Sequence, residues 1–147
     1  MKKLFLIAAI CWLGIQARAD DWLTNLPQAI AKAKAEKKVV LMDFTGSDWC
    51  PACMELHKKV LSTTEFNGYA STNLVLMLVD FPSHKPQSDD LKAANQALQE
   101  KYGIEGYPTL VLLDGDGKVL YKHIGYDEEP IKTVIANLES AKSGKGK

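Results

Sequence analysis

The alternation of apolar and polar stretches predicts four strands. Residues 39–45 (VVLMDFT) and 74–81 (LVLMLVDF) are short, nearly continuous apolar runs. Such runs are typical of strands in a parallel arrangement that are buried on both faces. Residues 108–113 and 118–124 form two further strands, and the Asp-Gly-Asp-Gly sequence between them indicates an antiparallel hairpin.

Helical spacing of apolar residues predicts helices before and between these strands. Trp22, Leu26, Ile30 and Ala33 recur every three or four positions, with lysines among them. The expected helices span residues 22–38, 51–61, 63–69, 89–102 and 127–141. The resulting order, α-β-α-α-β-α-β-β-α, predicts one α/β domain over residues 20–141, with a central mixed β-sheet and helices on both faces. Residues 142–147 are expected to form a flexible tail.

The first nineteen residues have the pattern of a secretory signal peptide. Two lysines follow the first residue, residues 4–15 are apolar, and residues 17–19 (Ala-Arg-Ala) are a small-x-small cleavage pattern. Cleavage is expected after Ala19, which would place the mature chain in the periplasm or outside the cell. The apolar run of about a dozen residues is short for a membrane anchor, since a span needs about 20. Lipid attachment at Cys11 is disfavoured because Ile10, rather than a small residue, precedes it.

The composition adds two observations, one on net charge and one on the number of cysteines. The chain is 46% hydrophobic and 24% charged, with a formal net charge of zero, so nothing favours nucleic-acid binding. Removal of residues 1–19 would reduce the lysines and arginines from 18 to 15 against 18 acidic residues, for a net charge of about −3. It would also remove Cys11, leaving Cys50 and Cys53. We expect this mature chain to be a monomer with no stable membrane insertion.

Cys50 and Cys53 are the strongest candidates for chemistry, because the loop that they would close is too short to stabilise a fold much. A Cys-x-x-Cys sequence that opens a helix directly after a buried strand places the first thiol at the helix N-terminus. There its pKa falls from about 8.5 toward roughly 3.5–7.5. Cys50 would then attack a disulfide, and Cys53, one turn further on, would resolve the mixed disulfide. Trp49 would cover this pair and offer an apolar contact surface.

Zinc binding is an alternative use of a Cys-x-x-Cys pair. A structural zinc site normally needs four ligands, and the sequence has no second pair of this kind. His57, His84 and His123 are expected on a helix, a loop and a strand, respectively. We therefore expect no metal, and no cofactor beyond a redox-active disulfide between the two cysteines.

Two linked segments carry a resemblance to a known family. Residues 49–53 (WCPAC) are followed about 55 residues later by residues 106–109 (GYPT), and then by the closing hairpin and helix. In this combination the chain resembles the thioredoxin superfamily, in particular exported bacterial thioredoxin-like thiol–disulfide oxidoreductases. The resemblance implies a thioredoxin fold and a cis peptide bond before Pro108, which would pack against the cysteines; an ordinary proline at the start of a strand is the alternative. The substrate-binding residues that it implies are Trp49, Pro51, Ala52, Tyr107 and Pro108.

The resemblance also points to Asp43 as a catalytic residue. Thioredoxins have a buried acid behind the second cysteine that moves protons for it, and Asp43 lies in the corresponding strand. However, it stands seven positions before Cys50, one more than in typical thioredoxins. Either the turn over residues 46–48 absorbs the extra residue and leaves Asp43 inward, or Asp43 faces elsewhere. The strand over residues 74–81 also lacks the lysine that thioredoxins often place near this acid; Leu76 is the nearest equivalent.

Together these features predict an exported enzyme that exchanges dithiols and disulfides with protein substrates and depends on an upstream redox partner protein. Pro51 offers no N–H to a thiolate and Ala52 adds no charge, which favours reduction or interchange over oxidation. Two alternatives stay open. The protein could be a disulfide oxidant or isomerase, or a non-catalytic module of thioredoxin fold that holds a client.

Overall fold

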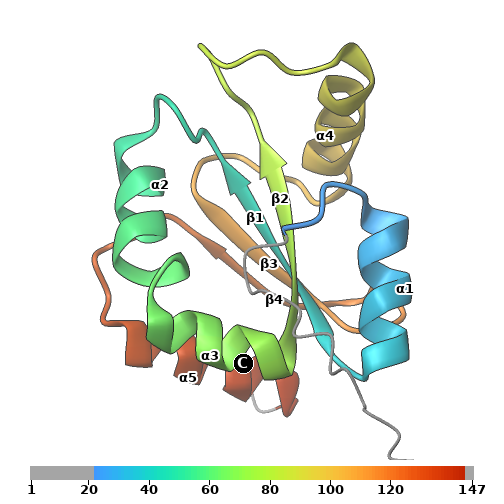
Figure 1. Ribbon diagram of the computed structural model, residues 1–147, viewed down its shortest axis with the longest axis vertical. Helices are drawn as coiled ribbons and strands as arrows, with labels where there is room; N and C mark the ends of the chain where they lie inside the picture. The colour runs from blue at the N-terminus through green and yellow to red at the C-terminus, as the bar shows by residue number, and fades with distance from the viewer. Residues whose placement is uncertain (1–21, 145–147) are drawn as a thin grey trace, which may run out of the picture.

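A computed structural model describes residues 22–144, which form a four-stranded mixed sheet with helices on both faces (Figure 1). The strand order is β2-β1-β3-β4, in which β1 and β2 are parallel and β3 is antiparallel to both β1 and β4. This arrangement confirms the predicted fold class. Residues 1–21, which include the predicted signal peptide, and residues 145–147 lie outside the described part of the chain. The elements are α1 (Leu26–Glu36), β1 (Val39–Thr45), α2 (Pro51–Leu56), the π-helical turn η1 (His57–Leu61), α3 (Thr64–Asn73), β2 (Leu74–Asp80), α4 (Asp89–Lys101), β3 (Thr109–Leu113), β4 (Val119–Ile124) and α5 (Ile131–Lys142).

Alternating residues of β1 face two separate apolar layers. Val40, Met42 and Phe44 pack with side chains of α1 and α4 on one face of the sheet. Val39 and Leu41 pack on the other face, which α2, α3 and α5 cover (Figure 1). Every residue of β1 is buried, as a central strand covered on both faces requires. This alternation decides which side chains of β1 can reach the helix that carries the cysteines.

Side-chain caps determine where three of the helices begin. Asn25, Thr63 and Ser88 each accept a hydrogen bond from a backbone N–H three residues ahead, at the starts of α1, α3 and α4. A cap of this kind contributes about 1 kcal/mol of stability. Because of the Asn25 cap, α1 begins at Leu26, and the prediction of a helix from residue 22 was wrong by four residues. Leu23 instead forms a parallel bridge with Met77 of β2.

Three other helices differ from the prediction at their boundaries. The helix predicted over residues 51–61 is α2 followed by η1, and α3 continues to Asn73. The helix predicted from residue 127 begins only at Ile131, because Glu128 has a left-handed backbone with φ of 57° and Pro130 is the N-cap.

Within residues 22–144, no helix is long and apolar enough to cross a bilayer.

The sheet topology brings two loops together at one end of β1. β1 ends at Thr45 and leads through a short turn into α2, which begins at Pro51. β3 begins at Thr109, which lies opposite Phe44 in the antiparallel pairing of the two strands. The turn before α2 and the segment before β3 are therefore neighbours, and both candidate motifs lie there.

Candidate active site

A disulfide between Cys50 and Cys53 lies at the start of α2. Cys50 is the N-cap residue, and its sulfur accepts a hydrogen bond from the Cys53 N–H at 3.3 Å. The two Cα atoms are 5.3 Å apart, and both residues are buried. Pro51 and Ala52 form the first turn of α2 between them, with Pro51 exposed and Ala52 half-buried. A thiolate on Cys50 would be stabilised here by the Cys53 N–H and by the helix dipole.

An aromatic cluster of Trp49, Phe81 and Tyr107 lies beside the disulfide. The indole N–H of Trp49 donates to the carbonyl oxygen of Phe81 at 2.7 Å, and its ring meets the Tyr107 ring edge-on with centroids 6.0 Å apart. Tyr107 also stacks on Phe81 at 5.2 Å. Gly46 makes room for the indole, since a Cβ there would lie 2.6 Å from Trp49 Nε1. Because Trp49 is 43% exposed and Met54 is 45% exposed, an apolar surface is available next to the cysteines.

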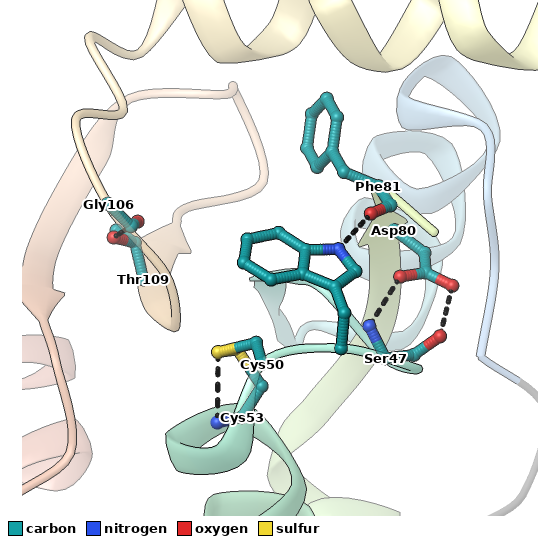
Figure 2. Close-up of a disulfide and its surroundings, with 8 residues drawn as sticks. Ser47, Cys50, Cys53, Asp80, Phe81, Gly106 and Thr109 are labelled. Atoms are coloured by element: carbon teal, nitrogen blue, oxygen red, sulfur yellow. Dashed lines mark hydrogen bonds between the residues drawn. A yellow bond between two sulfur atoms is a disulfide. The ribbon is translucent and has the colours of Figure 1, made fainter. Parts of the chain in front are cut away.

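The segment before β3 forms the opposite side of this surface. The Tyr107–Pro108 peptide bond is cis. The segment is held by two hydrogen bonds, from the Thr109 hydroxyl to the Gly106 carbonyl oxygen at 2.7 Å and from the Gly125 N–H to the Pro108 carbonyl oxygen at 2.8 Å. In Figure 2 the disulfide lies between Gly106 and Thr109 on one side and the Ser47–Asp80 pair on the other.

Asp43 faces the cysteine side of the sheet. It follows Leu41 on the face that α2 covers, and together with Cys53 it lines a cavity of about 350 Å³. The extra residue in the turn over residues 46–48 therefore does not direct Asp43 elsewhere. The residue is 4% exposed and its Oδ1 has no hydrogen-bond partner. Burial, with a smaller effect from the negative charge of Asp80, raises the pKa of Asp43 to about 7, so this carboxyl can release or accept a proton near neutral pH.

Asp48 anchors the loop that follows β2. The sequence indicated only that residues 46–48 form a turn, and it gave no sign of this contact. Its carboxylate accepts hydrogen bonds from the backbone N–H groups of Ser83, His84 and Lys85 at 2.9, 2.8 and 2.8 Å. These bonds, the one from Ser83 foremost, hold the pKa of Asp48 at about 2. These hydrogen bonds thus hold the loop after Phe81 against the turn before the cysteines.

Replacement of Asp48 by alanine is expected to release this loop. The amide hydrogens of Ser83, His84 and Lys85 should then exchange with solvent at least about tenfold faster, because their charged acceptor is lost. Hydrogen exchange followed by NMR would measure this. Asp90→Ala, which removes an exposed carboxylate in the first turn of α4, is the matched control. Equal exchange rates in the two variants would contradict the anchoring role.

Ser47 and Asp80 form a second polar pair that the sequence interpretation missed. The Ser47 N–H and hydroxyl both donate to the Asp80 carboxylate, at 2.9 and 2.6 Å (Figure 2). Asp80 stands near the end of the strand predicted over residues 74–81 and was given no other role. Strand alternation places Asp80 on the same face of β2 as residues 76 and 78, but it does not indicate Ser47 as its partner.

The histidines do not gather with the cysteines into a metal site. His57 lies in η1, His84 in the loop after β2 and His123 on β4. Among the described residues, no group of three or more His, Cys, Asp or Glu side chains is placed to hold a metal ion.

The fold and the disulfide agree with the comparison to known protein families. A family model described as a thioredoxin-like domain matches residues 26–141. The chain belongs to the thioredoxin-like family. The predicted family resemblance is confirmed, and the match covers every helix and strand except the last residue of α5.

Named relatives of this thioredoxin-like protein include a disulfide bond reductase and thiol:disulfide interchange proteins. The disulfide bond reductase DsbH of Chlamydia pneumoniae is 32% identical over 125 residues, which cover 85% of this chain and 75% of the relative. The solved structure of a DsbH oxidoreductase has a TM-score of 0.74 at 28% identity, covering 99% of this chain and 94% of that one. The thiol:disulfide interchange protein DsbD of Pseudoalteromonas atlantica is 35% identical over 96 residues, which cover 65% of this chain but 15% of that longer protein. With the Cys50–Cys53 disulfide, these findings identify this thioredoxin-like protein as a thiol–disulfide oxidoreductase.

Proposed function

We propose that this thioredoxin-like protein is an exported reductase or interchange protein for disulfides in other proteins. The observation that carries the proposal is the disulfide at the start of α2 beside an exposed apolar surface, which an unfolded or extended protein segment can contact. The relationship to DsbH, whose name is disulfide bond reductase, supports the reductive direction. Export rests on the signal-peptide pattern of residues 1–19, with cleavage after Ala19 into the periplasm or the exterior. The working unit is then the monomeric domain of residues 20–141, followed by a short tail.

The proposed reaction begins with the reduced protein. The Cys50 thiolate attacks one sulfur of a substrate disulfide, so that a mixed disulfide forms and the other substrate sulfur leaves as a thiolate. Cys53 then loses its proton, and its thiolate attacks the Cys50 sulfur. The Cys50–Cys53 bond forms while the second substrate sulfur leaves. The substrate disulfide has gained two electrons, and the protein dithiol has been oxidised to the disulfide seen here.

We propose that Asp43 accepts the proton of Cys53 during these reaction steps. Both residues line the same cavity, and the pKa of Asp43 near 7 suits a group that accepts the thiol proton and later returns it to solvent. An upstream dithiol protein must then reduce the disulfide again, because nothing in the reaction itself restores the starting state.

The substrate would lie across the surface formed by the WCPAC turn and the segment before β3. Trp49 and Tyr107 supply apolar rings, and an extended chain would pair with the backbone of Tyr107, the half-buried residue before the cis bond to buried Pro108. Pro51 and Ala52 separate the cysteines without adding a charge. We therefore expect a reduction potential between about −270 and −120 mV, nearer the reducing end.

Replacement of Cys53 by serine is expected to trap the reaction at its intermediate. Cys50 can still attack a substrate, but no thiol remains to resolve the mixed disulfide, so covalent complexes that dithiothreitol releases should accumulate. Non-reducing gels and mass spectrometry of the exported fraction would reveal and identify them.

The double variant Cys50→Ser/Cys53→Ser is the control for this experiment, since it keeps the surface and lacks the nucleophile. The proposal fails if the single variant traps no more protein than the double variant. If the trapped partners carry catalytic dithiols of disulfide-forming enzymes only, the protein is a reductant of those enzymes rather than of folding clients. Accelerated formation of disulfides by the wild type in reduced substrates would instead indicate an oxidant.

A further inference from the structure

Two acidic side chains, not one, line the cavity behind Cys53. Its walls include Asp43, His57, Asp80 and Lys85 in addition to Cys53. Asp43 is buried, and its Oδ1 has no hydrogen-bond partner. The mechanism above uses Asp43 and leaves Asp80 without a function.

The register of the sheet explains why the two acids share this cavity. β1 and β2 run parallel, with Asp43 opposite Leu78 and Thr45 opposite Asp80. Since alternate residues of a strand share a face, Asp80 lies one step further along the same face as Asp43. It stands at the end of the strand, where the face opens toward the turn that precedes the cysteines.

Ser47 fixes the Asp80 carboxylate in this position. Its backbone N–H donates to Oδ1 at 2.9 Å and its hydroxyl donates to Oδ2 at 2.6 Å (Figure 2). The Asp80 backbone is held as well, because its carbonyl oxygen accepts hydrogen bonds from Asn95 Nδ2 at 2.8 Å and from Gln87 Nε2 at 3.1 Å. The charged group therefore cannot turn away from the cavity without breaking the bonds to Ser47.

We propose that Asp80, held by Ser47, is a positioning residue that acts on the cysteine pair through Asp43 and determines at which pH Asp43 can take the proton of Cys53. This inference rests on the proposed function. A fixed negative charge beside a buried carboxyl disfavours its ionisation, which makes it a stronger base once it is ionised. The hydrogen bonds between Ser47 and Asp80 thus couple the turn that precedes the cysteines to the proton transfer behind them.

Lys85 and His57 also line this cavity, and a positive charge on either would act against Asp80. The Lys85 ammonium lies 3.4 Å from the Ser47 hydroxyl oxygen, and His57 of η1 contributes a second titratable group to the lining. A protonated His57 or the Lys85 charge would favour ionised Asp43, whereas Asp80 opposes it. The variant that tests the proposal must therefore remove the Asp80 charge and leave these two groups in place.

Asp80→Asn is such a variant, because its amide can still accept from the Ser47 N–H and donate to the Ser47 hydroxyl. The experiment is a titration of the Asp43 carboxyl by isotope-edited infrared spectroscopy in the oxidised protein, whose cysteines do not titrate. We expect the midpoint to fall by about one pH unit from its wild-type value near 7. Asp90→Asn, which removes an exposed charge of α4, should leave the midpoint unchanged.

A kinetic measurement distinguishes an electrostatic contact from a role in the reaction. The pH profile of substrate disulfide reduction should move in Asp80→Asn in the same direction and by a similar amount as the Asp43 midpoint. The proposal is overturned if the midpoint stays at the wild-type value, or if it moves while the pH profile does not. Ser47→Ala, which frees the carboxylate but keeps its charge, should produce a smaller shift of the same sign and serves as the test if Asp80→Asn does not fold.

The titration needs no substrate, so its outcome is independent of the trapping experiment. A failure of Cys53→Ser to trap partners, with an Asp43 midpoint that still responds to Asp80, would reject the proposed function. Successful trapping with an unresponsive midpoint would reject only the role of Asp80.

Discussion

Replacement of Cys50 by serine is expected to abolish the reduction of protein disulfides, lowering the rate by at least about a thousandfold. The serine hydroxyl does not ionise near neutral pH and cannot form a mixed disulfide, so the first covalent step is lost. The surface of Trp49, Phe81 and Tyr107 is unaffected, and binding of an extended chain would persist. The measurement is turnover of a disulfide-containing protein such as insulin, with a small dithiol as the electron source.

Cys53→Ser is the informative partner of this variant. It should also stop turnover, but it should still complete one attack per molecule and release one substrate thiolate. Single-turnover measurements therefore separate the two cysteines, with one equivalent of thiolate from Cys53→Ser and none from Cys50→Ser. Full biological activity of Cys50→Ser would mean that the protein holds clients without redox chemistry, the alternative left open by the sequence.

Asp43→Asn is expected to remove most of the loss of stability that the oxidised wild-type protein suffers as pH rises from about 4 to 8. The folded protein holds the Asp43 proton up to its pKa of about 7, whereas the unfolded chain releases it near 3.8. Between these values the folded state binds one more proton, so its stability falls by about 1.4 kcal/mol per pH unit. The total from this one carboxyl is about 4 kcal/mol, and above pH 7 the loss is complete.

Urea unfolding of the oxidised protein at a series of pH values would test this expectation, since the disulfide prevents the cysteines from titrating. The quantity to compare is the difference in unfolding free energy between the variant and the wild type, which should increase from pH 4 to 8. Asp90→Asn, at an exposed position of α4, should show no such increase. A difference that is constant with pH would mean that Asp43 is not protonated in the folded protein at neutral pH.

The sequence was sufficient for the fold because the central strands are unambiguous. Residues 39–45 and 74–80 are apolar on both faces, and the Asp-Gly steps after residue 113 permit little other than a hairpin. The prediction failed where a local pattern competed with a tertiary contact. Trp22 and Leu23 fit the helical spacing of α1, but the Asn25 cap and the pairing of Leu23 with Met77 exclude them from the helix.

Only those residues of the candidate site that form a motif or follow from strand alternation could be predicted. Cys50 and Cys53 are a motif in the sequence, and Asp43 could be placed by strand alternation once the sheet was known. The contacts of Ser47 with Asp80, 33 positions later, and of Asp48 with the loop at residues 83–85 depend on how the ends of β1 and β2 meet. No spacing rule in a single sequence encodes such pairings, and both turn residues looked like ordinary turn formers.

The bridge at Leu23 has a practical consequence for shortened versions of the protein. Its N–H donates to the Leu76 carbonyl oxygen at 2.9 Å, and its own carbonyl oxygen accepts from the Leu78 N–H at 2.8 Å. A chain cut to residues 26–141 would retain almost every helix and strand but would leave this part of the β2 edge open. An open, apolar strand edge is a template for pairing with another molecule, so the shortened protein would be prone to aggregation. Cleavage after Ala19 would leave the protective residue in place.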